Sequence, residues 1–120
     1  MCRVVVVDDE PEFRKWLLSL LKGSDDFEVV GEASTGPEAI QLVKIVMPDL
    51  VIADVYIPLP DGLEVARYVH DCFPGIKAIL ISAHTERVYE RLARREGALA
   101  FIPKARLSLD VLRQALQGAG

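Results

Sequence analysis

The chain has 120 residues, 51% of them hydrophobic, and its 14 Lys and Arg against 18 Asp and Glu leave a net charge of −4. This length suits one domain with a real apolar core, which excludes a disordered chain, a collagen and a disulfide-stapled miniprotein. The negative charge argues against direct nucleic-acid binding. With only Cys2 and Cys72, and no apolar run near the roughly 20 residues of a membrane span, we expect a cytoplasmic protein without a membrane segment.

Short apolar runs alternate with longer amphipathic stretches. The runs, each predicted to form a strand, cover residues 3–7, 27–33, 50–53, 77–81 and 99–102. Most are rich in Val, Ile and Leu without alternation, which is typical of parallel strands covered on both faces.

The first two intervals carry apolar residues at helical spacing. The face of the first helix comprises Phe13, Trp16, Leu17, Leu20 and Leu21. This spacing places Trp16 in the core, and Gly23 is expected to end the helix. The second helix is expected to begin with a capping box at Thr35 and to end before Pro48. Its predicted inward face comprises Ala39, Ile40, Val43 and Met47.

Three further helices are predicted, from about 63 to 71, from about 86 to 96, and after the N-cap Ser108. Five strand–helix units in strict alternation imply right-handed crossovers. The predicted fold is therefore α/β, a doubly wound five-stranded parallel sheet with five helices, formed by one domain over residues 1–120.

Polar side chains follow four of the five predicted strands. Asp8 and Asp9 come after the first, Asp54 after the third, Ser82 after the fourth and Lys104 after the fifth. Ligands of open α/β sheets bind outside the carboxyl ends of the strands. We therefore expect these side chains to converge on one rim.

Three carboxylates on one rim disfavour one another's charge, and a bound divalent cation removes that penalty. Hard oxygen ligands with room for water suit Mg²⁺, which typically bridges to a phosphate. The rim therefore predicts phosphoryl chemistry, with Asp54 as nucleophile and Lys104 neutralising the transferred oxygens. Taken singly, Asp9 could be a helix N-cap, Ser82 a turn hydroxyl and Lys104 a solvated lysine, so the prediction rests on their coincidence.

In this order the motifs resemble the receiver domain of two-component response regulators, a CheY-like fold with strand order 2-1-3-4-5. The resemblance covers nearly the whole chain and is carried by residues 4–10, 48–54, 58, 61–62, 81–83, 97–98, 101 and 104. It implies that Asp54 accepts a phosphoryl group from a sensor histidine kinase. It also implies a regulatory protein rather than an enzyme, one that catalyses only its own Mg²⁺-dependent phosphorylation and dephosphorylation.

The same resemblance implies a metal site. Asp9 would bind Mg²⁺ directly, Asp8 would hold its water shell, and Asp54 would contribute a ligand oxygen. The backbone carbonyl of Tyr56 would be a further protein ligand. Tyr56 and His84 would flank the path of the hydrolytic water, and the bulk of Tyr56 predicts slow self-dephosphorylation. Taken singly, His84 is also explained as a turn residue before a helix cap.

The resemblance further implies a switch. The Ser82 hydroxyl and Lys104 would contact phosphoryl oxygens, and Phe101 would change rotamer, which would remodel the surface of the fourth helix and fifth strand. Two positions depart from the commoner pattern. Ala105 follows Lys104 where many relatives carry proline, which leaves the geometry of that loop open because a non-proline cis bond costs about 2.5 to 4 kcal/mol. Leu59-Pro60 lies in the turn before Asp61-Gly62 and is expected to stiffen that turn.

Residues 29–39 and 103–105 resemble receivers attached to LuxR-type helix-turn-helix DNA-binding domains. The expected function is therefore transcriptional control through an output domain beyond the chain, with a homodimer as one option. The alternatives are a stand-alone receiver and a phosphorylation-independent module, each acting through protein partners. A haloacid-dehalogenase-type phosphatase would place two Asp one residue apart after the first strand, which the adjacent pair Asp8 and Asp9 does not match. A dinucleotide site would need a glycine-rich turn there.

Overall fold

Five parallel strands form one sheet in the order β2-β1-β3-β4-β5 in a computed structural model, which describes residues 1–84 and 87–118. The strands are β1 (Cys2–Val7), β2 (Phe27–Ala33), β3 (Leu50–Asp54), β4 (Lys77–Ser82) and β5 (Ala100–Pro103). The helices are α1 (Pro11–Lys22), α2 (Gly36–Val46), α3 (Gly62–Cys72), α4 (Arg87–Arg95) and α5 (Leu109–Gln117), with a 3₁₀ helix η1 (Lys104–Arg106). The predicted α/β class and strand order are confirmed. The described element bounds lie within one residue of the predicted ones, except that the predicted start of α4 at residue 86 lies outside the described residues.

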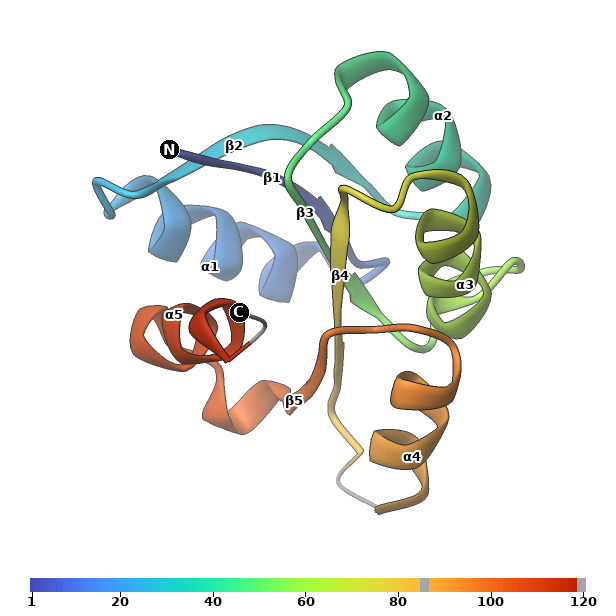
Figure 1. Ribbon diagram of the computed structural model, residues 1–120. Coiled ribbons are helices and arrows are strands. Elements are labelled where there is room, and N and C mark those ends of the chain that lie inside the picture. Colours follow the sequence, from blue (N-terminus) through green and yellow to red (C-terminus); the bar gives the residue numbers. More distant parts are fainter. Residues whose placement is uncertain (85–86, 119–120) are drawn as a thin grey trace.

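The helices cover both faces of the sheet (Figure 1). α1 and α5 pack on one face, and α2, α3 and α4 pack on the other. β1 shows why its sequence does not alternate: Val4 and Val6 pack in the core beneath α1 and α5, while Val5 and Val7 pack in the core beneath α2, α3 and α4. All four valines are fully buried. The uninterrupted apolar strands of the sequence are thus explained by a sheet without a solvent face.

Short polar signals begin and end the helices as predicted. The Thr35 hydroxyl accepts a hydrogen bond from the Glu38 N–H at the start of α2, and the Ser108 hydroxyl accepts one from the Val111 N–H at the start of α5. Gly23 is the C-cap of α1. Within the described residues, every helix is too short or too polar to cross a membrane.

Two residues predicted to be buried are exposed. Trp16 is 46% exposed, because the buried face of α1 is centred on Leu17, Leu18 and Leu21 and leaves Trp16 at its edge. Met47 is 50% exposed, because α2 ends at Val46 and Met47 takes a left-handed backbone conformation with φ of 46°. The following proline disfavours the right-handed helical conformation at Met47, so the chain turns there and carries the side chain away from the core.

Candidate functional site

Three carboxylates meet at the carboxyl ends of β1 and β3. These strands pair in parallel, with Val7 opposite Ala53, so Asp8 and Asp54 leave the sheet side by side. One oxygen from each of Asp8, Asp9 and Asp54 lies within 4.8 Å of the others. The structure therefore brings together all three acidic residues that the sequence places after these strands.

Two of these carboxylates are buried, whereas Asp9 is exposed. Backbone N–H groups orient the buried pair: Asp8 Oδ1 accepts from the Glu10 N–H at 2.8 Å, and Asp54 Oδ1 accepts from the Tyr56 N–H at 2.9 Å. Glu10, not Asp9, is the N-cap residue of α1, and its side chain makes no capping bond. Burial raises the pKa of Asp8 above its ordinary value, and this effect outweighs the lowering of the pKa by the contact with Lys104. The folded protein therefore disfavours the ionised form of Asp8.

Lys104 supplies the positive charge of the site. Its Nζ atom lies 2.8 Å from Asp54 Oδ2 and 2.9 Å from Asp8 Oδ2, and its side chain is 11% exposed. Burial by itself disfavours the ammonium, but the ion pairs with Asp54 and Asp8 outweigh it and raise the pKa of Lys104. Lys104 stays charged at neutral pH and bridges the two buried carboxylates.

The loop that carries Lys104 needs no proline. β5 ends at Pro103, and the chain continues directly into the 3₁₀ helix Lys104–Arg106. Among the described residues the cis peptide bond is Leu59–Pro60, in the segment between β3 and α3, and the Lys104–Ala105 bond is trans. The ammonium therefore reaches both carboxylates with alanine at position 105.

The donor set fits a hard divalent cation. In the described part of the chain, the Lys104 ammonium pairs with two of the three carboxylates, so the cluster keeps an excess of negative charge. Among the described residues, Asp8 Oδ2 is a buried oxygen without a well-aligned hydrogen bond, although the Lys104 ammonium lies nearby. Asp9 is exposed, which leaves space for the water ligands that Mg²⁺ retains. Asp8, Asp9 and Asp54 are the residues that could hold the ion, and the Tyr56 carbonyl stays a prediction.

Ser82 lies at the carboxyl end of β4, beside the acidic cluster. The β3–β4 register pairs Asp54 with Ile81, so Ser82 is the next residue along β4. Ser82 is fully buried, and its hydroxyl accepts a hydrogen bond from the His84 N–H at 3.0 Å. Its contact with a phosphoryl oxygen stays a prediction.

Aromatic rings extend from the site to β5 and include a residue that sequence reasoning missed. The hydroxyls of Tyr56 and Tyr89 form a hydrogen bond, and the Tyr56 ring also packs 4.9 Å from His84. Tyr89, on α4, stacks on Phe101 with 6.2 Å between ring centroids. The sequence analysis singled out Tyr56, His84 and Phe101 but not Tyr89. The one sequence feature that marks Tyr89 is its position as an aromatic residue on a strongly charged helix.

Comparison with known proteins agrees with this geometry. Residues 4–117 match the family described as "Response regulator receiver domain". The chain is 36% identical over 117 residues to the "Probable transcriptional regulatory protein NarL" of Mycobacterium tuberculosis (strain CDC 1551 / Oshkosh), covering 98% of this chain and 54% of that protein. The signal receiver domain of a NarL response regulator from Mycobacterium tuberculosis has a TM-score of 0.90 and 36% identity, with 98% of this chain and 95% of that chain covered. The chain therefore belongs to the response regulator receiver domain family.

The relatives are longer than this chain. A protein-glutamate methylesterase/protein-glutamine glutaminase of Pyrococcus abyssi is 38% identical over 117 residues, which cover 96% of this chain but 32% of that protein. The chain thus spans between a third and about half of the length of these relatives. The shared region is the receiver domain, and the two relatives are named for different functions.

Proposed function

We propose that this chain is a phosphorylation-dependent signalling switch in which Asp54 accepts a phosphoryl group from a phosphohistidine of a sensor histidine kinase. The observation that carries the proposal is Lys104, whose ammonium bridges the buried carboxylates of Asp8 and Asp54 within a cluster of three. Family membership supports the same assignment. We also propose that residues 1–120 form one receiver domain.

The proposed step is an in-line phosphoryl transfer. A carboxylate oxygen of Asp54 forms the new P–O bond as the P–N bond of the donor breaks. The electron pair of the broken P–N bond stays on the imidazole nitrogen. Mg²⁺, when bound by the acidic residues, neutralises phosphoryl oxygen charge. The Tyr56 N–H orients Asp54 through Oδ1. Lys104 is already within ion-pair distance of Asp54 Oδ2 and can hold a phosphoryl oxygen without a large movement.

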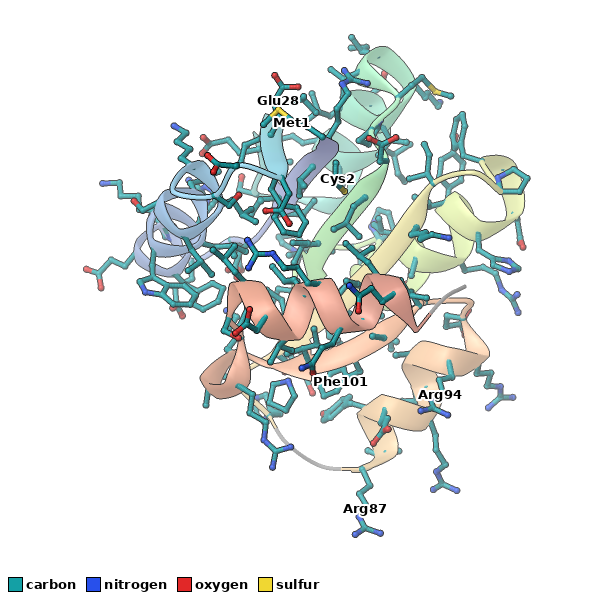
Figure 2. All side chains as sticks on the ribbon, turned by 60° about the vertical axis from the view of Figure 1, so that its left-hand side comes forward. Met1, Cys2, Glu28, Arg87, Arg94 and Phe101 are labelled. Carbon is teal, nitrogen blue, oxygen red and sulfur yellow. The ribbon has the colours of Figure 1, made fainter. Side chains whose placement is uncertain are left out.

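The proposed output is a change in the surface formed by α4 and β5. Ser82 would swing its hydroxyl to a phosphoryl oxygen, and Phe101 would change rotamer. The stacking of Phe101 on Tyr89 joins β5 to α4, so a movement of one ring requires the other to adjust. The outer face of α4 is basic, and Arg87 and Arg94 point away from the body of the protein (Figure 2). This surface is the proposed site of partner contact.

A transcriptional output is the second part of the proposal. A relative of 36% identity is named as a transcriptional regulator, and the sequence features of residues 29–39 and 103–105 point the same way. DNA would be bound by a LuxR-type output domain, in a cytoplasmic protein that is able to form homodimers, and not by the receiver itself. Reading the coding sequence beyond residue 120 tests this part. A helix-turn-helix supports it, and a stop codon favours a stand-alone receiver.

The phosphoacceptor is tested by intact mass spectrometry after incubation with Mg²⁺ and acetyl phosphate. We expect one phosphoryl adduct in the wild type, no adduct in Asp54→Asn, and no adduct when a chelator is present during the reaction. Circular dichroism controls for folding of the variant. A folded wild type that gains no adduct from acetyl phosphate or from a histidine-kinase donor contradicts the proposal and favours a phosphorylation-independent interaction module.

A further inference from the structure

A phenyl ring from α1 covers the ammonium of Lys104. The Nζ atom lies 4.2 Å from the centroid of the Phe13 ring, well inside the distance of about 6 Å at which a cation is attracted to an aromatic face. The same nitrogen contacts Asp8 and Asp54. The described surroundings of the ammonium are therefore two carboxylate oxygens and the face of one ring.

The Phe13 ring is held in place by its neighbours on α1. It belongs to the first turn of the helix, directly after the acidic loop. The next residue, Arg14, donates from Nη1 to the Asp8 carbonyl oxygen at 2.7 Å and from Nε to Glu32 Oε1 at 3.0 Å. The ring of Trp16 packs against Phe13 with 5.4 Å between centroids. The turn that carries Phe13 is thus fastened to the acidic loop and to β2.

A ring in this place has a specific effect on a lysine. Lys104 is connected to the backbone by a flexible chain, and at 11% exposure its side chain has lost most of its contact with water. The negative face of an aromatic ring attracts the ammonium and so offsets part of that loss. It also covers one direction in which the side chain could otherwise leave the carboxylates.

We infer that Phe13 is a positioning residue, whose ring face holds the Lys104 ammonium against Asp54 so that the counter-charge is in place when the phosphoryl group arrives. This inference rests on the proposed function. It goes beyond it by assigning a role to a side chain that the helical pattern of the sequence marks only as core. An apolar side chain of similar size would fill the same core volume, so electrostatic attraction and packing predict different results.

The contact itself is tested without phosphorylation, by NMR of the Mg²⁺-free protein. In the wild type, the ring current of Phe13 should shift the ε-methylene protons of Lys104 upfield. Phe13→Leu should return them to the ordinary lysine position, whereas Phe13→Tyr should keep the shift. Tyr68→Leu is the matched control, because it removes a partly buried aromatic side chain from α3, on the other face of the sheet, and leaves Phe13 and its neighbours unchanged.

The role is tested by the rate at which the phosphoryl adduct forms with acetyl phosphate and Mg²⁺. From the usual strength of such contacts, Phe13→Leu should slow the reaction by about 3- to 10-fold, and Phe13→Tyr should restore it. Pentafluorophenylalanine at position 13 reverses the charge distribution of the ring at nearly the same shape, and it should slow the reaction as leucine does. This replacement and Phe13→Tyr preserve the packing even where Phe13→Leu does not fold.

The outcomes separate the two proposals. Equal rates in the wild type, Phe13→Leu and the fluorinated protein overturn the positioning role, whether or not the lysine signals move. Lysine signals that stay unshifted in the wild type overturn the contact. A wild type that gains no adduct overturns the proposed function, and the role given to Phe13 falls with it.

Discussion

Gly62 lies where α3 begins and where the backbone of β3 ends, and replacing it by alanine should destabilise the protein strongly. An added Cβ would lie 2.7 Å from the Val55 Cα and closer still to the Asp54 carbonyl oxygen, whereas ordinary contact begins near 3.4 Å. These neighbours are backbone atoms, so no side chain can turn aside. The Gly62 N–H also donates to the Val55 carbonyl at 3.0 Å, which ties the two segments together.

The magnitude follows from these contacts. Overpacking costs about 1 to 3 kcal/mol, and disturbing the hydrogen bond adds about 1 kcal/mol, so Gly62→Ala should lose about 3 kcal/mol. For 120 residues the unfolding entropy is about 0.25 kcal/mol per kelvin, and the melting temperature should therefore fall by about 12 °C. Because the clash lies at the backbone of Asp54, phosphoryl acceptance should slow as well.

Gly75 supplies the matched control. A Cβ there would meet nothing within 4 Å, and the residue lies in a turn outside the helices. Gly75→Ala should stabilise the protein by about 0.4 to 1 kcal/mol, because alanine restricts the unfolded chain. Thermal unfolding followed by far-UV circular dichroism compares both variants with the wild type. A Gly62→Ala variant that melts within about 2 °C of the wild type would contradict the predicted clash, as would a Gly75→Ala variant whose melting temperature falls as far as that of Gly62→Ala.

Three further perturbations test the acidic site, the aromatic cluster and a helix cap. In EDTA at pH 7.5, Asp8→Asn should melt above the wild type. The pKa of Asp8 is raised in the folded state, so ionised Asp8 destabilises the fold at a pH above that pKa. The difference between the two proteins should shrink as the pH is lowered to the ordinary aspartate pKa of about 3.9, and a constant difference would contradict this. Mg²⁺ at 100 times its dissociation constant should add about 2.7 kcal/mol to the free energy of unfolding of the wild type, and most of this gain should be absent in Asp8→Asn by chemical denaturation. Tyr56→Asn should shorten the lifetime of the phosphorylated protein, because it removes the ring beside the acceptor and the hydroxyl contact with Tyr89. An unchanged decay of the phosphoryl adduct in mass spectra would count against the prediction that Tyr56 keeps water from the phosphoryl group. Ser108→Ala should cost about 1 kcal/mol, or about 4 °C in melting temperature, because it removes the N-cap of α5, while Ser108→Asn should retain most of the stability.

Most of the fold could be predicted from the sequence because its signals are local. The unbroken valine run of β1 predicts a strand buried on both faces, and all four valines are buried. The Thr35 and Ser108 hydroxyls each accept a hydrogen bond from the N–H three residues later, so these caps can be read from neighbouring sequence. The acidic residues of the site follow from the same local information. Asp8 and Asp54 each end an apolar run, and the ends of parallel strands lie on one edge of the sheet.

Other features depend on how elements distant in the sequence lie against one another. The sequence placed Lys104 on the rim, but only the tertiary structure brings the first turn of α1 to the residue that follows β5 and so puts the ring of Phe13 over its ammonium. The bond between Tyr56 and Tyr89 likewise needs α4 beside the loop that follows β3. Helical spacing placed Trp16 in the core, yet the edge of a helix face is buried only where a neighbouring element covers it. Local periodicity therefore determined the elements and the residues at their ends, whereas the contacts that tune the site were decided by tertiary packing, because no local pattern specifies which surfaces of distant elements meet.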